Sequence, residues 1–124
     1  MKITVPLEPV TKKNSQQIIY VKGRAMIIPS KKYKEYEKMA MQYLMFCTDY
    51  IDYPVNIEAH FYMKTRRKCD LTNLLEAIDD VLVKAGVIED DNYTIIVGHD
   101  GSRVHYDKDN PRTELIITEV KYGL

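Results

Sequence analysis

Two segments of the chain carry apolar side chains at helical spacing. This pattern predicts a first helix over residues 31–48 and a second over residues 71–85, because positions three and four apart share one helix face. Ser30 precedes the first segment as a favourable N-cap, and Gly86 follows the second where helices commonly end. The apolar face of the second predicted helix consists of Leu71, Leu74, Leu75, Ile78, Val81, Leu82 and Ala85. Further apolar residues widen the first helix, so we expect the sheet, and as one option a partner chain, to cover it; they are Met39, Met41, Met45 and Phe46.

Other segments follow the two-residue period of β-strands. Residues 55–63 alternate most clearly between apolar and polar side chains, which predicts a strand with one face in the core. Shorter β-prone segments are residues 2–7, 17–21, 25–28, 93–97 and 112–121. The second and third of these predict a hairpin around Lys22-Gly23-Arg24, and Pro6 suggests a sheet edge or a strand end. The polar residues 98–110 predict loops or a loose hairpin.

The order of these elements predicts one domain over residues 1–124. We expect an α/β fold of the α+β type, in which a mixed sheet of about five or six strands packs with two main helices. No apolar run approaches the roughly 20 residues of a membrane span, and no leader pattern opens the chain. We therefore expect a cytoplasmic protein with no membrane partner, and free thiols at Cys47 and Cys69.

The charge of the chain is divided between its two halves, although the net charge is zero. Residues 1–68 contain 13 Lys and Arg against 6 Asp and Glu, whereas residues 69–124 contain 5 against 12. A basic half suits phosphate contacts, and an acidic half suits metal-binding carboxylates. Two differently solvated surfaces would explain the same division.

The two halves meet in residues 64–91, where a basic run passes directly into a helix rich in carboxylates. The run comprises Lys64, Arg66, Arg67 and Lys68. Each acid has a structural explanation, since Asp70 can cap the helix, the acids near residue 90 suit a turn, and the helix acids can form a wet face. These explanations do not account for six carboxylates from Glu76 to Asp91 against one cation, Lys84. A nearby cation would relieve their repulsion.

The donor set favours a divalent metal ion. Carboxylate and amide oxygens suit Mg²⁺, or Mn²⁺, rather than zinc. The sequence DLTNLL lacks the alternating ligands and central glycine of an EF-hand, and no nucleophilic triad or glycine-rich phosphate loop is recognisable. The three histidines are scattered along the chain, and we expect His60 to be a solvated strand residue.

The same segment resembles the RusA-type endodeoxyribonucleases, Holliday junction resolvases that prophages often carry. The family pattern is Asp-x-Asp-Asn, an aspartate one helix later, a glycine turn and a paired Asp-Asp. The matching positions here are Asp70, Asn73, Asp80, Gly86, Asp90 and Asp91. The resemblance implies a mixed α/β fold, a symmetric homodimer, and Mg²⁺-dependent nicking of branched DNA during recombination and repair.

Two positions depart from the family pattern. Thr72 stands where the pattern has its second aspartate, and Glu76 stands where many members have a catalytic lysine. Residues four apart stack on one helix face, so Glu76 could restore the missing carboxylate one turn later. Lys68 or Lys84 could replace the lysine.

These observations give a hypothesis for the site. Catalysis and metal binding fall to Asp70, Asp91, Glu76 and Asp90, with Asp91 reaching back across the glycine turn to meet Asp70. Contacts to branched DNA fall to Lys12, Lys13, Lys64, Arg66, Arg67, Lys68 and Asn73. One alternative is a catalytically impaired protein of the same fold that still binds branched DNA. Another is an unrelated interaction domain whose acids are only surface charge.

Overall fold

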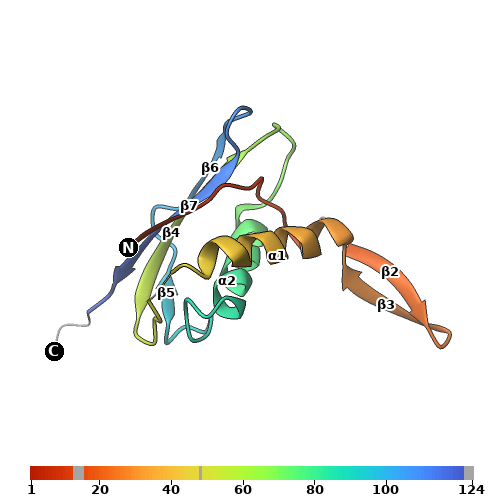
Figure 1. Ribbon diagram of the computed structural model, residues 1–124, viewed down its shortest axis with the longest axis horizontal. Helices are drawn as coiled ribbons and strands as arrows, with labels where there is room; N and C mark the ends of the chain where they lie inside the picture. The colour runs from red at the N-terminus through yellow and green to blue at the C-terminus, as the bar shows by residue number, and fades with distance from the viewer. Residues whose placement is uncertain (13–15, 48, 122–124) are drawn as a thin grey trace.

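The structure is a computed structural model that describes residues 1–12, 16–47 and 49–121. In chain order its elements are β1 (Lys2–Val5), β2 (Gln16–Val21), β3 (Arg24–Pro29), α1 (Lys31–Leu44), β4 (Val55–Met63), α2 (Leu71–Lys84), β5 (Ile96–Gly98), β6 (Arg103–Tyr106) and β7 (Arg112–Glu119) (Figure 1). None of the helices in these ranges is long and apolar enough to cross a membrane. Both cysteines are free, as predicted.

Five strands of the described chain form a mixed sheet in the order β1-β7-β4-β5, with β6 also paired to β4. Strand β7 runs antiparallel to both β1 and β4, whereas β5 and β6 run parallel to β4. Strand β5 pairs with the beginning of β4 and β6 with its end, so both lie along the same edge of β4. This sheet and the two helices confirm the predicted fold class.

The core lies between one face of this sheet and the two helices. Along β4, buried side chains alternate with half-buried ones, as the sequence predicts for a strand with one covered face. The buried apolar residues of β4, β7, α1 and α2 belong to one cluster, and Figure 1 shows both helices on the same side of the sheet. The fold therefore leaves the other sheet face, with His60 and Tyr62, open.

The helix boundaries follow the caps that the sequence indicates, with one difference. The Ser30 Oγ accepts a hydrogen bond from the Tyr33 amide at 3.2 Å, and Gly86 has a φ of +74°, which glycine adopts readily. Helix α1 ends at Leu44 and not at residue 48. Leu44 is its last buried residue, whereas Phe46 is 82% exposed, so no packing energy supports another turn.

Two strand predictions in the C-terminal half need correction. The strand predicted over residues 93–97 is displaced to β5, because the amides of Ile95 and Ile96 both donate to the carbonyl of Asn92 and hold the preceding residues in a turn. The segment predicted as loop over residues 98–110 contains β6. Its polar sequence hides the strand, since β6 lies at a sheet edge with little burial.

The predicted hairpin is present as a separate two-stranded sheet, β2 and β3, which we call the arm. Its turn has positive φ angles at Lys22 (52°) and Gly23 (79°), as two-residue hairpin turns require. Figure 1 shows the arm extending from the N-terminal end of α1, away from the main sheet.

Candidate active site

Four carboxylates gather beside the second half of α2 and form what we call the acidic edge: Asp79, Asp80, Asp90 and Asp91. Asp79 and Asp80 follow one another on the helix, and Asp90 and Asp91 lie in the turn that returns after Gly86. The charges of Asp80 and Asp91 both reach Asp79, and the charge of Asp80 reaches Asp91. The helix and its glycine turn therefore bring together acids that are well separated in the sequence.

Asp79 is buried against His99, contrary to its predicted place on the wet helix face. Its Oδ2 lies 2.9 Å from the His99 Nε2, while the Nδ1 of the same ring lies 2.9 Å from the Ile57 carbonyl. The carbonyl can only accept, so Nδ1 donates to it, and in the protonated ring Nε2 donates to the Asp79 carboxylate. Burial raises the pKa of Asp79, and although burial lowers the pKa of His99, the Asp79 hydrogen bond and charge raise it.

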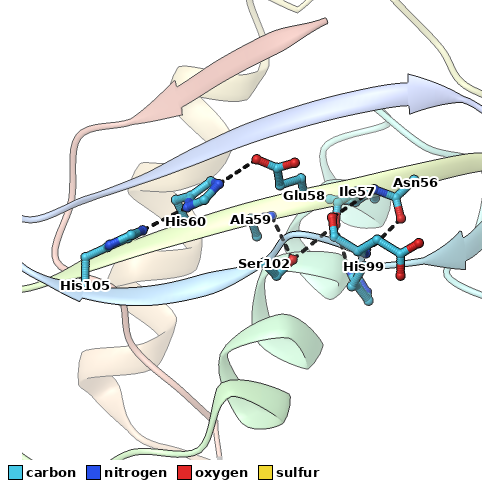
Figure 2. Close-up of polar contacts among 9 residues, drawn as sticks. Asn56, Ile57, Glu58, Ala59, His60, His99, Ser102 and His105 are labelled. Atoms are coloured by element: carbon cyan, nitrogen blue, oxygen red, sulfur yellow. Dashed lines mark hydrogen bonds and ion pairs between the residues drawn. The ribbon is translucent and has the colours of Figure 1, made fainter.

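The segment that carries His99 is held along the edge of β4 by side chains rather than by strand pairing (Figure 2). Asn56 donates to the Asp100 carbonyl at 3.2 Å and accepts from the Asp100 amide at 2.8 Å. The Ser102 Oγ accepts from the Ala59 amide at 2.9 Å. These bonds connect the segment between β5 and β6 to β4. They hold this segment where the His99 ring contacts Asp79 of α2.

Lys12 reaches the acidic edge from the N-terminal segment. Its Nζ lies 2.6 Å from the Asp80 Oδ2, and the charges of Glu37 and Glu76 also act on it. The Asp80 hydrogen bond raises the pKa of Lys12 despite partial burial. Glu76 stands one helical turn before Asp80, so Lys12 is a cation set among three carboxylates.

Asp90 and Asp91 have opposite electrostatic settings although they are neighbours. The Asp90 carboxylate accepts hydrogen bonds from the Asp91 amide at 2.8 Å and from the Asn92 side chain at 2.9 Å, and these bonds lower its pKa. Partial burial, the contact with Asp90 and the charge of Asp80 raise the pKa of Asp91. Asp91 is therefore the acid of this turn that an added cation would benefit most.

Asp70 lies at the other end of α2. It is the N-cap residue, but its side chain makes no capping hydrogen bond; instead its Oδ2 accepts from the Asn73 amide group at 3.4 Å. Ten residues of helix, about 15 Å, separate Asp70 from Asp80. Within the described ranges no three His, Cys, Asp or Glu side chains converge as a metal site. Of the four predicted ligands, Asp70 lies at the start of α2 and Glu76 on its second turn, whereas Asp90 and Asp91 lie in the turn that follows the helix.

A basic groove with a volume of about 380 Å³ lies beside the start of α2. Its lining residues are Glu8, Pro9, Val10, Thr11, Lys32, Met63, Thr65, Arg67, Lys68, Cys69 and Leu74. Two residues of the predicted DNA-binding run, Arg67 and Lys68, line it, and α1 adds Lys32, which the sequence reading missed. Thr11 also lines the groove, and the next residue, Lys12, contacts the acidic edge, so the two features are contiguous.

The other predicted DNA contacts are distributed around this groove. Lys64 and Arg66 are exposed in the same loop, and the Arg66 guanidinium lies 4.1 Å from the centre of the Tyr106 ring. Asn73 is half-buried on the first turn of α2. Lys13 lies outside the described residues.

Two of the three histidines, His60 and His105, meet in space, contrary to the prediction that all three are scattered, whereas His99 pairs with Asp79. On the open sheet face, the His60 Nδ1 lies 2.8 Å from the His105 Nε2, and the His60 Nε2 lies 2.6 Å from the Glu58 Oε2 (Figure 2). His105 also stacks on Tyr62 with ring centres 4.5 Å apart. His60 is consequently a hydrogen-bonded side chain rather than a solvated one.

Comparison with known proteins places the chain among nucleases. Residues 6–118 match the family model of the endodeoxyribonuclease RusA. The chain belongs to this family. One relative is the crossover junction endodeoxyribonuclease RusA of Aquifex aeolicus (strain VF5), which is 43% identical over 47 residues. That match covers 38% of this chain and 37% of the relative.

The fold shows which cations lie near Glu76, where many members of the RusA family have a lysine. Lys84, one candidate to replace the lysine of the family pattern, is paired with Glu37 of α1 at 2.8 Å. The charge of Glu76 acts instead on Lys12. The positive charge near Glu76 therefore comes from Lys12 of the N-terminal segment.

Sequence reasoning missed the site contributions of Asp79, His99 and Lys32. Asp79 lies next to the buried apolar face of α2, but a helical pattern alone does not show whether an acid at that position is buried or solvated. His99 lies in a segment that reads as loop, and Lys32 is one lysine among several on α1. Only the packing of β4, α1 and α2 brings His99 to Asp79 and Lys32 to the basic groove.

Proposed function

We propose that this protein is a Mg²⁺-dependent endodeoxyribonuclease that resolves four-way DNA junctions by paired nicking. The observation that carries the proposal is the contiguity of the acidic edge with the basic groove. A phosphodiester strand bound in the groove by Arg67, Lys68 and Lys32 would pass the carboxylates of α2. Family membership supplies the reaction class.

The donor chemistry of the acidic edge fits Mg²⁺. This ion keeps several waters and needs only one or two protein carboxylates, with substrate phosphates completing its shell. Burial, the contact with Asp90 and the charge of Asp80 raise the pKa of Asp91, and a bound cation would offset the repulsion among these acids. One buried Asp79 oxygen, Oδ1, also lacks a hydrogen-bond partner among the described residues.

Bound Mg²⁺ would supply an activated water for in-line attack and would stabilise charge on the phosphate. Asp91 would hold it, with Asp80 and Asp90 beside it. Asp70 and Glu76 would lie beside the same DNA strand, nearer the start of α2. The chain's own part is to orient the phosphate: Arg67 and Lys68 neutralise it, and Lys12 keeps Asp80 in position.

Cutting a four-way junction requires two incisions related by symmetry. A homodimer with one acidic edge in each subunit would provide them, because a two-fold dimer presents two identical sites to two equivalent strands. We therefore include the homodimer in the proposal.

A second candidate is a protein that binds branched DNA without cutting it. It is favoured by the lack of a three-residue metal-ligand group among the described residues and by the departures at Thr72 and Glu76. This candidate requires the basic groove but not the acidic edge.

The deciding experiment is nicking of a synthetic four-way junction in Mg²⁺. The parent protein should release symmetric nicked products, and Asp91→Asn should reduce the rate by about 100-fold or more while junction binding is retained. A matched control is Glu119→Gln, which changes an exposed acid at the end of β7 and should cut at the parent rate.

Other outcomes separate the two candidates. Tight binding by parent and variant with no Mg²⁺-dependent cleavage would support the binding protein and refute the nuclease. Equal cleavage by parent and Asp91→Asn would contradict the role of Asp91. Thermal unfolding with Mg²⁺ adds a measure that does not depend on activity, since the melting temperature of the parent should rise more than that of Asp91→Asn.

A further inference from the structure

The arm exposes apolar side chains on both of its faces. On one face, Ile18 and Ile27 are paired across the strands and are 66% and 68% exposed, beside Tyr20 at 76%. On the other face, Met26 and Val21 are also exposed. Among the described elements, β2 and β3 pack substantially only against each other. An isolated two-stranded hairpin is marginally stable in water, so this surface needs a cover.

A second apolar surface lies at the opposite end of α1. We call it the α1 tail patch; it consists of Tyr43, Met45, Phe46 and Tyr50, all exposed. The exposed acids Asp49 and Asp52 flank it. The last turn of α1 contains no basic residue, so nothing on this helix offsets its negative C-terminal end.

The two surfaces are complementary in charge and in length. The tip of the arm carries two exposed cations, Lys22 and Arg24, which suit the flanking acids Asp49 and Asp52 and the negative helix end. Each strand of the arm has 6 residues, about 20 Å, and α1 has 14 residues, about 21 Å. An arm lying along a second α1 would therefore place its tip at the tail patch.

We propose that the arm embraces a second copy of this chain, with its apolar face along the partner's α1 and its tip at the partner's tail patch. Two antiparallel α1 helices make this contact twice around a two-fold axis, which closes the assembly. The proposal rests on the homodimer of the proposed function and assigns its surface. DNA is a less suitable occupant, because the cations of the arm are confined to its tip while its length is apolar.

The test uses one substitution in each surface, with mass measured by light scattering after gel filtration. Ile27→Lys changes the arm and Phe46→Glu changes the tail patch. Each substitution alters both symmetry-related contacts of the dimer. Each should therefore raise the dimer dissociation constant by about 100-fold or more and give monomers. Val104→Thr, which alters an exposed apolar residue of β6, should leave the parent mass unchanged.

Mixing the two variants provides the sharper result. A mixed dimer contains one unaltered arm-to-patch contact and one contact in which both surfaces are altered. The charges introduced by Ile27→Lys and Phe46→Glu are opposite in sign, so neither is buried against an entirely apolar surface in this second contact. Mixing should therefore restore dimers that neither variant forms alone. Circular dichroism checks folding, and Ile27→Thr serves as a milder arm variant if Ile27→Lys unfolds.

Three results would overturn the assignment. Dimers formed by Ile27→Lys and Ile27→Thr at parent strength would show that the arm is not the interface. Monomeric arm variants beside dimeric Phe46→Glu would show that the arm contacts another surface. Variants that remain dimeric but lose junction binding would assign the arm to DNA. Mass is measured without substrate, so loss of nicking in the Asp91→Asn experiment does not bear on this result.

Discussion

At the residue scale, the acidic edge depends on how each carboxylate is compensated. Asp80 is paired with Lys12, Asp90 accepts backbone and side-chain hydrogen bonds, and Asp79 is paired with His99. Asp91 has the least compensation, since the charged side chains that act on it, Asp80 and Asp90, are also acids. The pKa of Asp90 is therefore lowered while those of Asp79 and Asp91 are raised, because their partners differ.

The Asp79–His99 pair should make stability depend on pH. The folded-state pKa values of both groups are raised, so the folded protein holds protons that the unfolded chain releases. The contribution of His99 is complete below its unfolded pKa of about 6.5 and is lost as the pH rises through its raised folded value. In EDTA, the parent should lose about 1–2 kcal/mol of unfolding free energy relative to His99→Gln as the pH rises from about 6 to 8.5.

Urea denaturation of both proteins across this range measures the difference. A parent advantage over His99→Gln that grows with increasing pH would contradict the pairing. A constant advantage would mean that His99 acts by packing alone.

At the scale of elements, the two helices begin differently although both N-cap residues suit a cap. Ser30 uses its side chain to accept the Tyr33 amide, whereas the Asp70 carboxylate caps no amide of α2. The first turn of α2 is closed by backbone hydrogen bonds from Asn73 and Leu74 to the Asp70 carbonyl. The Asp70 carboxylate is therefore available at the helix end nearest the basic groove.

This difference predicts unequal costs of substitution. Ser30→Ala should lower the free energy of unfolding by about 1 kcal/mol, because a helix amide loses its acceptor. Asp70→Asn should change it by less than about 0.5 kcal/mol while reducing junction nicking, because the side chain caps no helix amide and the substitution removes only its charge. Chemical denaturation and the nicking assay measure the two effects, and a large stability loss in Asp70→Asn would identify the carboxylate as structural.

At the scale of the whole molecule, the fold turns a division of charge along the sequence into two adjoining surfaces. Basic residues of the N-terminal half, Lys32, Arg67 and Lys68, line the groove, and the Thr11-Lys12 segment connects it to the acidic edge of the C-terminal half. Lys12 crosses from one to the other. A net charge of zero therefore coexists with a locally basic groove.

Junction binding should be strongly salt-dependent through this groove. Arg67→Ala combined with Lys68→Ala should reduce the slope of log affinity against log salt by roughly 0.9 for each phosphate that the variant no longer neutralises. Fluorescence anisotropy of a labelled junction across a salt series measures the slope. Lys121→Ala, an exposed cation beyond β7, is the control, and an equal effect of this control would show that the groove is not the binding surface.

The sequence by itself determined the features that depend on near neighbours. Helical and alternating periodicities report which side of an element is covered, so α2, β4 and the hairpin were predicted close to their observed bounds. The caps at Ser30 and Gly86 are local for the same reason. The motif from Asp70 to Asp91 indicated the family, because its spacing is a property of the chain alone.

Only the tertiary structure decided which side chains meet. The contacts of Lys12 with Asp80 and of Asp79 with His99 join residues 68 and 20 positions apart, and they depend on how the N-terminal segment and the edge of β4 cross α2. Periodicity carries no information about such crossings, since it records burial and not partners. For the same reason the sequence did not indicate that the charges of Asp80 and Asp91 act on Asp79.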